Sequence, residues 1–278
     1  RSPDIKTVTD QARLLVEEGY KEIVVTGVNA GDFGYGTNEN FYQLLKALDS
    51  IKNLERIRFS SVEPNLLHDE IIDLAASSNS IQPHFHIPLQ SGSDRMLAIM
   101  RRRYQTDLYR HRVEKIKRLM PDACIGVDVI TGHPGETDEL FEESYAFIES
   151  LDISYLHVFT YSERADTHAL NIKPNIQDSI RKERTHKLRR LSAKKRYTFD
   201  LQFRNQKRPV LFEQYNNDGL IMGYTDNYIR VALPYNPAHT NQILSVELLK
   251  RHNDGYYLGE LEEQTAEEQQ VINELIEA

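Results

Sequence analysis

The sequence predicts an α/β protein in which parallel strands alternate with helices, followed by a small all-β barrel. Two observations along the chain support this fold class. Apolar, strand-like runs recur roughly every 30 residues through the first 161 residues, with amphipathic helical patterns between them. After a long basic stretch, short strands separated by turn residues follow from about residue 205, as in a small β-barrel.

Five segments of the first part have the composition of strands. They are rich in Ile, Val and Phe, and several are nearly continuous apolar runs, which is typical of parallel strands covered on both faces. In chain order they are Glu22–Thr26, Arg56–Val62, Pro83–Leu89, Cys124–Thr131 and Tyr155–Tyr161. Alternating strands and helices imply right-handed crossovers. Five strands are too few for a closed eight-stranded barrel, and a strand expected before the first helix is absent.

Helices are predicted from the spacing of apolar residues and from capping residues. The first begins near Thr7 and ends at Gly19, since glycine commonly follows a helix end. We expect Thr106 to cap a helix that stops at Pro121, and Thr137 to cap the next one. The apolar faces of three helices are Phe41, Leu44, Leu45 and Leu48, then Tyr109, Val113, Ile116 and Met120, then Phe141, Tyr145 and Ile148.

The second part is predicted to be a barrel of five short strands. They are Pro209–Glu213, Gly219–Tyr224, Tyr228–Ala232, Ile243–Leu249 and Gly255–Leu261. We therefore divide the chain into residues 1–203, which end in a basic helix, residues 204–262, which form the small barrel, and residues 263–278. The last of these is an acidic tail, expected to be helical, with Val271, Leu275 and Ile276 as its apolar anchors.

Composition excludes several classes of protein. The 278 residues include one cysteine, Cys124, which excludes an intramolecular disulfide and any zinc or cluster site built on several thiolates. No apolar run approaches the roughly 18 residues that span a bilayer. We expect a cytoplasmic protein with no membrane contact, and the sequence carries no signal for its oligomeric state.

The net charge of −8 conceals a basic segment. Between Arg181 and Arg208 the chain has twelve Lys or Arg residues and two acids, whereas the last nineteen residues have seven Glu and no base. A basic segment in an acidic chain is the pattern of a nucleic-acid surface. A solvated helix whose charges keep the protein soluble explains the same pattern, and the residues alone leave both interpretations open.

Polar loops follow three of the predicted strands, at Thr26–Gly34, Gln90–Ser93 and Thr131–Thr137. Because the carboxyl ends of parallel strands meet at one edge, these loops indicate one shared ligand site. Tight strand-to-helix turns explain their glycines equally well. Asp128 lies inside an apolar strand and Glu63 at the end of another. Each carboxylate either has a structural role, in an ion pair or a cap, or accepts hydrogen bonds from the ribose hydroxyls of a nucleoside.

His84, His86 and Gln90 stand at alternate positions of one predicted strand and share a face if that strand is regular. Pro88 is able to introduce a bulge that breaks this alternation. The two histidines are either a metal pair that lacks an evident third ligand or buried, hydrogen-bonded imidazoles. We favour the second interpretation and assign no metal ligand.

Seven motifs resemble those of the radical S-adenosylmethionine (SAM) enzymes and, more narrowly, of the methylthiotransferases that modify tRNA. They are Thr26-Gly-Val-Asn29, Ser61-Val-Glu-Pro-Asn65, His86-Ile-Pro-Leu-Gln-Ser-Gly-Ser93, Met100-Arg-Arg-Arg-Tyr104, Asp128-Val-Ile-Thr-Gly132, Pro134-Gly-Glu-Thr137 and Tyr161-Ser-Glu-Arg164. The resemblance implies a partial parallel (β/α) barrel of the radical SAM type. Residues 204–261 resemble a TRAM domain, a small RNA-binding β-barrel. One departure is Ala165-Asp166, where relatives usually have Pro or Gly before Thr167.

The resemblance also implies the site residues. SAM would be held by Glu63, Gln90, Arg102 on the helix after the fourth strand, and Asp128. The loop with Thr26, Gly27 and Asn29 would lie by the methionine end of SAM and Tyr161 by its adenine, while Ser91 and Gly132 belong to motifs of the same site. The RNA-binding residues would be Lys194, Lys195, Arg196, Lys207 and Arg208, with tRNA as the partner.

Enzymes of this family hold a [4Fe–4S] cluster on a Cys-x₃-Cys-x₂-Cys loop and a second cluster on an N-terminal domain, and this chain has neither set of cysteines. The resemblance therefore implies a fragment that is inactive without the clusters. The intact enzyme would cleave SAM reductively, remove hydrogen from C2 of adenosine 37 of a tRNA, and add a methylthio group there.

The loop Thr26–Gly34 resembles the branch that acts on N6-threonylcarbamoyladenosine. Two enzymatic alternatives are the isopentenyladenosine of tRNA and an aspartate of a ribosomal protein. Relatives of the last type have Gln-His where this chain has Gln90-Ser91. A non-enzymatic RNA-binding protein is a third alternative.

Overall fold

The computed structural model describes residues 3–163, 167–215, 219–261 and 266–277. Five parallel strands occupy the predicted positions: β1 (Glu22–Val25), β2 (Arg56–Phe59), β3 (His84–His86), β4 (Cys124–Thr131) and β5 (Tyr155–Thr160). The bounds of β4 are those predicted. β3 is shorter than predicted because Pro88, which has no N–H group, interrupts its pairing.

The five strands lie side by side in chain order. β1 pairs with β2, and β4 pairs with β3 on one side and β5 on the other, all in parallel. A single bridge between Ile57 and Ile81, and a hydrogen bond of 3.1 Å from the Val62 N–H to the His86 carbonyl, join the two groups. Among the described residues β1 and β5 remain edge strands, so the predicted partial parallel barrel is confirmed.

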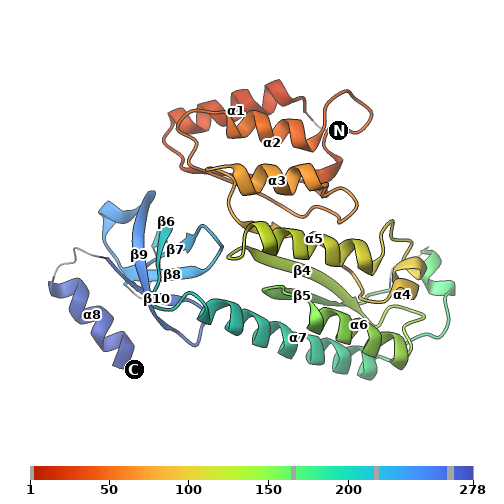
Figure 1. The fold of residues 1–278 in the computed structure, drawn as a ribbon. Coiled ribbons are helices and arrows are strands. Elements are labelled where there is room, and N and C mark those ends of the chain that lie inside the picture. The colour runs from red at the N-terminus through yellow and green to blue at the C-terminus, as the bar shows by residue number, and fades with distance from the viewer. Residues whose placement is uncertain (1–2, 164–166, 216–218, 262–265, 278) are drawn as a thin grey trace.

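Helices connect the strands and cover them from outside. They are α1 (Ile5–Glu17), α2 (Phe41–Asp49), α3 (Asp69–Ser77), α4 (Asp94–Ile99), α5 (Thr106–Leu119), α6 (Asp138–Ser150) and α7 (Asp178–Leu201), with short 3₁₀ turns at Ala30–Asp32, His168–Asn171 and Pro237–His239. In Figure 1, α5 lies on one side of β4, while α6 and α7 lie on the other side, beyond β5. Across the described ranges, no helix has the length and apolar character needed to cross a membrane.

One of the two predicted helix caps is confirmed. The Thr137 hydroxyl accepts a hydrogen bond from the Leu140 N–H, so Thr137 caps α6. Thr106 is instead the first residue of α5, and Gln105 precedes it as the capping residue. The prediction for Thr106 was wrong because a residue distant in sequence takes over: the carboxylate of Asp94 accepts the Thr106 N–H at 2.7 Å.

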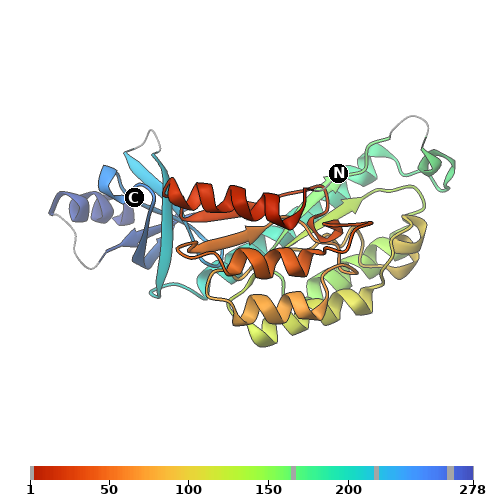
Figure 2. The same ribbon diagram turned by 90° about the horizontal axis from the view of Figure 1, so that it is seen from above.

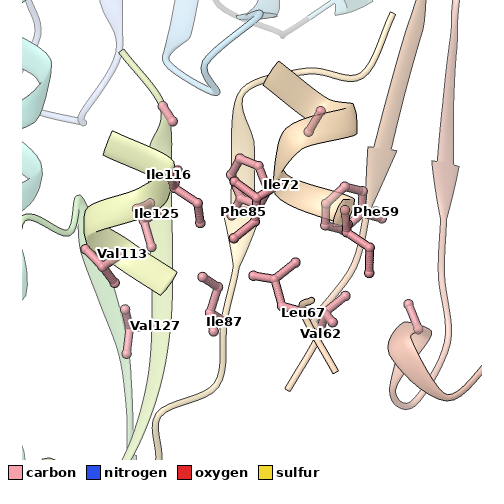
Figure 3. Close-up of a cluster of buried hydrophobic side chains, with 14 of the residues drawn as sticks. Phe59, Val62, Leu67, Ile72, Phe85, Ile87, Val113, Ile116, Ile125 and Val127 are labelled. Atoms are coloured by element: carbon pink, nitrogen blue, oxygen red, sulfur yellow. The ribbon is translucent and has the colours of Figure 1, made fainter. Parts of the chain in front are cut away.

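Apolar side chains of the strands pack against α3 and α5 to form the main core (Figure 3). Phe59 and Phe85 meet edge to face, with ring centroids 5.7 Å apart. Fully burying one such side chain stabilises the fold by about 1.5–3 kcal/mol. The other labelled members of this cluster are Val62, Leu67, Ile72, Ile87, Val113, Ile116, Ile125 and Val127.

The second part of the chain is a closed five-stranded barrel, as predicted. Its strands are β6 (Lys207–Tyr215), β7 (Leu220–Thr225), β8 (Arg230–Pro234), β9 (Gln242–Arg251) and β10 (Tyr257–Glu260), and β10 closes the barrel between β8 and β9. The interior is tight at Gly259, where a Cβ atom would lie 2.3 Å from Cγ1 of Val246. A small closed barrel after the helix is consistent with the TRAM-like fold.

The acidic tail contains a helix, α8 (Ala266–Glu277), that lies beside this barrel (Figure 1). Ile272 is buried, and Leu275 and Ile276 pack against barrel residues that include Leu220 and Met222. The predicted anchors Leu275 and Ile276 are confirmed, whereas the side chain of Val271 lies outside the described part of the chain. Apolar contact therefore holds an otherwise acidic helix in place.

Two arginines of β2 join the small barrel to the amino ends of the parallel strands. Arg56 donates to the carbonyls of Tyr224 and Pro209. Arg58 donates to the carbonyls of Thr225 and Asp226 at 2.8 and 2.9 Å and pairs with Glu22. Figure 2 shows the resulting elongated molecule, with the small barrel and α8 at one end of the strands.

Replacing Arg58 by alanine should destabilise the protein strongly. The Arg58 side chain is 3% exposed, and its loss leaves the Glu22 carboxylate and two carbonyl groups without their donors. Breaking a buried ion pair in this way costs about 3–5 kcal/mol. Urea unfolding of Arg58→Ala measures the change. The control Arg118→Ala, at an exposed position of α5, should stay within about 0.5 kcal/mol of the parent. A similarly small effect of Arg58→Ala would contradict the role of this junction.

Candidate functional site

A polar cavity of about 580 Å³ lies at the carboxyl ends of the parallel strands. Four of its lining residues are those to which the resemblance to radical SAM enzymes assigns the main contacts with SAM: Glu63, Gln90, Arg102 and Asp128. Asn29, from the loop after β1, lines the same cavity. Residues from five separate loops, turns and strands therefore converge on one site.

Gln90 reaches the cavity through an irregular turn of the backbone. The N–H groups of Leu89 and Gln90 both donate to the Asp128 carbonyl, at 3.1 and 2.8 Å. Gln90 has a φ of 67°, a left-handed conformation that costs free energy for a residue other than glycine. Gln90 and Pro88 both line the polar cavity, whereas His84 and His86 line another cavity nearer the small barrel.

Arg102 and Glu63 form an ion pair across the cavity, with 3.2 Å between Nη1 and Oε1. The sequence places Arg102 on a helix, but α4 ends at Ile99 and Arg102 lies in the turn before α5. Arg101 has a φ of 57°, which turns the chain away from the helix. The turn directs the Arg102 side chain into the cavity.

Asp128 occupies the interior face of β4 and is 19% exposed. Its Oδ1 atom lies 2.8 Å from Nε2 of His86. Asp128 and Gln90 also line a neighbouring cavity of about 420 Å³ that includes Phe159 and Tyr161. The two cavities share these residues, so a single elongated ligand can contact both.

Tyr161 is held at the wall of this second cavity. The Arg181 guanidinium lies over its ring at 5.4 Å from the centroid, and the His133 ring meets it edge-on at 5.0 Å. Burial lowers the pKa of His133 below its ordinary value, although a hydrogen bond to the Pro134 carbonyl opposes this. A neutral His133 therefore packs against Tyr161 at neutral pH.

The predicted loop after β1 divides between two cavities. Thr26 and Gly27 line an apolar cavity of about 570 Å³ beside α1 and α2. Asn29 lines both this cavity and the polar one, and its Oδ1 atom accepts the Glu63 N–H at 3.4 Å. Of the three residues, Asn29 is the one that meets Glu63 and Asp128 in the same cavity.

Ser91 and Gly132 lie near the site but have structural roles in the described contacts. Ser91 is 1% exposed, and its hydroxyl bonds to Ser144 on α6 instead of lining the cavity. Gly132 has a φ of 72°, and a Cβ atom there would lie 2.3 Å from Cγ of Arg181. The close approach of α7 therefore explains this glycine without a ligand.

Several residues that support the site escaped the sequence analysis. The Tyr104 hydroxyl donates to the carbonyls of Pro88 and Leu89, and the Tyr109 hydroxyl donates to that of Ile87. Burial raises the pKa of both phenols, so they remain donors. In the sequence, Tyr104 is the last residue of the motif Met100–Tyr104, and Tyr109 belongs to the apolar face of a predicted helix. Neither pattern indicates that these hydroxyl groups bond to the backbone of the β3 segment.

Most of the proposed RNA-binding residues are engaged within the protein. Lys195 donates to the carbonyls of Glu149 and Leu151, and Arg196 pairs with Asp200. Arg208 is 11% exposed and pairs with Asp122 and Asp226 at 2.7 Å. These contacts give all three cations structural roles: Lys195 at the end of α6, and Arg196 and Arg208 at the junction with the small barrel.

Lys194 and Lys207 are exposed. Other cations of α7 also face solvent: Lys182, Arg189 and Arg190. Within the described ranges no ion pair involves these three residues or Lys194. The outward face of α7, defined by Lys182, Arg189, Arg190 and Lys194, is therefore a basic surface that is available to a partner.

Cys124 lies at the start of β4, at the junction with the small barrel. It is buried among residues that include Phe199, Phe203 and Val210. Burial raises the pKa of its thiol, whereas nearby Arg196 lowers it. A single buried thiol at the amino end of a strand does not fit a [4Fe–4S] cluster, which needs several accessible thiolates.

Comparison with known proteins identifies the family of this chain. The model of the radical SAM superfamily matches residues 1–148. A threonylcarbamoyladenosine tRNA methylthiotransferase MtaB of Bacillus subtilis is 36% identical over 276 residues, which cover 96% of this chain and 61% of that protein. The protein of the same name from Aquifex aeolicus is 41% identical over 199 residues, covering 72% of this chain and 48% of the relative.

A tRNA-2-methylthio-N(6)-dimethylallyladenosine synthase of Bacillus velezensis is 34% identical over 232 residues, covering 81% of this chain and 45% of that protein. The chain thus spans roughly half the length of the curated relatives it matches. The matched superfamily region runs from the first residues into α6 and contains Glu63, Gln90, Arg102 and Asp128. The chain is similar in sequence to methylthiotransferases of tRNA, and it belongs to the radical SAM superfamily.

Proposed function

We propose that this chain is the SAM- and RNA-binding part of a longer cytoplasmic radical SAM methylthiotransferase that modifies tRNA. The convergence of Glu63, Gln90, Arg102 and Asp128 on one cavity carries the proposal. The 36% identity over 276 residues to a protein named as a tRNA methylthiotransferase supports the same reaction class.

The residues of the cavity fit SAM. In the polar cavity, Oδ1 of Asn65 and Nε of Arg102 are buried without a hydrogen-bond partner. Buried polar atoms without partners are uncommon, and a polar ligand would satisfy them. Glu63 and Asp128 are suited to accept hydrogen bonds from hydroxyl or amine groups, and Arg102 to donate to a carboxylate. Phe159 and Tyr161 offer ring faces to an adenine.

SAM, when bound, supplies the methyl group and the adenosyl group of the reaction. The contribution of this chain is to bind and orient it. Asp128 is held by His86, Glu63 is held by Arg102, and the Gln90 turn is fixed by the carbonyl of Asp128. Preorganised groups of this kind lower the entropic cost of reaching a reactive geometry.

We propose that this chain alone holds no [4Fe–4S] cluster and is inactive. Its single thiol, Cys124, is buried away from the polar cavity, so the residues present do not fit that group. In the longer protein, the cluster ligands would have to come from a region that corresponds to the part of the relatives outside the match to this chain.

We further propose that the substrate is N6-threonylcarbamoyladenosine at position 37 of tRNA. The names of the relatives that are 36% and 41% identical support this choice over the dimethylallyl substrate of the relative at 34%. The two substrates differ in a carboxylate-bearing arm against an apolar one. A site that forms hydrogen bonds with the carboxylate-bearing arm would react with the apolar analogue up to about 10⁴-fold more slowly, because the polar groups of the site would then be left unpaired.

Deleting the gene for the longer protein should therefore remove 2-methylthio-N6-threonylcarbamoyladenosine from tRNA. Mass spectrometry of digested bulk tRNA measures both methylthio nucleosides in one sample. Complementation with the intact gene should restore the product, whereas complementation with this chain alone should not. Loss of the dimethylallyl product, with the threonylcarbamoyl product retained, would refute this substrate.

Replacing Asp128 by asparagine in the longer, cluster-containing protein should weaken SAM binding by roughly 10- to 150-fold. The reason is the loss of a charge-assisted hydrogen bond worth about 1.5–3 kcal/mol. Equilibrium dialysis with labelled SAM measures the affinity. The matched control is Asp107→Asn at an exposed position of α5, which should bind SAM as the parent does. An unchanged affinity of Asp128→Asn would exclude Asp128 from the site.

We propose that tRNA binds along the outward face of α7. A helix of 24 residues is about 36 Å long, and Lys182, Arg189, Arg190 and Lys194 are exposed along it. Basic side chains without protein partners are suited to phosphate groups, and each contact adds to the salt dependence of binding. Of the residues assigned from sequence, Lys194 fits this surface best.

The double variant Arg190→Ala/Lys194→Ala should lower the slope of log K against log salt concentration by about 1.4–1.8, if each cation contacts one phosphate. Binding of tRNA to the chain at several salt concentrations measures this slope. The control Lys52→Ala/Arg118→Ala removes the same charge at exposed positions of other helices or loops. Equal slopes for the two double variants would show that α7 contributes only to the net charge of the protein and does not contact the tRNA phosphates.

A further inference from the structure

Three potential metal ligands converge inside the parallel part of the molecule. They are His86 on β3, Asp128 on β4 and His157 on β5, and one ligand atom from each lies within 4.8 Å of the others. Pairing between the strands produces this arrangement, because Asp128 and His157 are register partners in β4 and β5. The sequence showed His86 as half of a histidine pair with no third ligand, and the fold supplies two partners from other strands.

The side chain of His86 is already oriented for coordination. Its Nε2 atom lies 2.8 Å from Oδ1 of Asp128, and its Nδ1 atom lies 3.2 Å from the hydroxyl of Ser61. A metal-binding histidine commonly donates its other ring N–H to an oxygen atom, which fixes the tautomer and the ring orientation. Ser61 is placed for this role, with Nδ1–H donating to its hydroxyl and the Nε2 lone pair directed at the ion.

The ring of His157 contacts two neighbouring aromatic rings. The ring contacts Tyr155 edge-on at 5.2 Å and lies 5.3 Å from the His86 ring. In the described part of the chain no hydrogen bond to either ring nitrogen of His157 is formed. Burial lowers the pKa of His157, and the neighbouring His86 lowers it further while Asp128 opposes this. The ring nitrogens of His157 are therefore placed to offer a lone pair to an ion between the three groups.

The surroundings leave room for an ion with bound water. His86 and His157 line a cavity of about 540 Å³, so a coordination position can remain open. Zinc–nitrogen distances of about 2.0–2.1 Å place neighbouring ligand atoms about 3–4 Å apart. The separations of up to 4.8 Å need to shrink by up to about 1–2 Å to reach that spacing, whereas the His86–Asp128 pair at 2.8 Å is already this close. Rotation of exposed or half-buried side chains can supply such a change.

We propose that His86, Asp128 and His157 bind a first-row divalent metal ion, of the Zn²⁺ or Fe²⁺ class. Two imidazoles and one carboxylate, with an open position, are the donor set of several such sites. In the metal-free chain the Nε2–H of a neutral His86 can donate to Asp128. When the ion binds, the imidazole takes its other tautomer, with the proton on Nδ1 facing Ser61, so that the Nε2 lone pair is free to coordinate the ion. Asp128 also belongs to the proposed SAM site, but metal binding requires neither SAM nor RNA, so it can be tested independently of the proposed function.

Titration of the chelator-treated chain with Co²⁺ tests the proposal. We expect one equivalent of Co²⁺ to bind, with visible absorption bands of a site of low coordination number. His157→Ala and His86→Ala should abolish this stoichiometric binding, and Ser61→Ala should weaken it by about 10- to 100-fold through loss of the orienting contact. His68→Ala, at an exposed position before α3, is the matched control and should bind as the parent does.

The thermal midpoint provides a second readout that also reports folding. Zn²⁺ should raise the midpoint of the parent and of His68→Ala, because an ion that binds only the folded state stabilises it. It should leave the midpoint of His157→Ala unchanged. If His157→Ala does not fold, His157→Gln replaces it. Absence of stoichiometric Co²⁺ binding by the parent, or equal binding by a folded His157 variant, would overturn the proposal.

Discussion

The parallel pairing of β4 with β3 and β5 is the constraint on which the rest of the structure depends. It sets Asp128 opposite His157 and within hydrogen-bond distance of His86. The carbonyl of the same residue accepts the N–H groups that fix the Gln90 turn. A shift by one residue would exchange the two faces of β4. Val127 or Val129 would then face the cavity, and the carboxylate would enter the apolar core.

The two ends of the parallel strands serve different purposes. At their carboxyl ends polar side chains remain accessible around a cavity. At their amino ends Arg56 and Arg58 satisfy carbonyl groups of the small barrel. The helix α7 shows the same division along its two faces. Inward cations such as Arg184, paired with Glu136, hold elements together, while the outward cations face solvent.

Much of the fold followed from local sequence, and the side-chain partners did not. The bounds of β4 and the cap at Thr137 are local properties, which apolar composition and capping chemistry reveal. The error at Thr106 and the structural role of Arg208 depend on Asp94, Asp122 and Asp226, which tertiary packing brings near. Likewise, the sequence of β5 does not identify His157 as a candidate ligand, because its role depends on its register opposite Asp128 in the neighbouring strand.

The position of Cys124 gives the molecule a built-in reporter. This thiol, the single one of the chain, is enclosed by residues of α7 and the small barrel. A reagent can reach it only when the barrel separates from the parallel strands or when the chain unfolds. The rate of thiol alkylation under native conditions therefore measures how often this junction opens, without any introduced label.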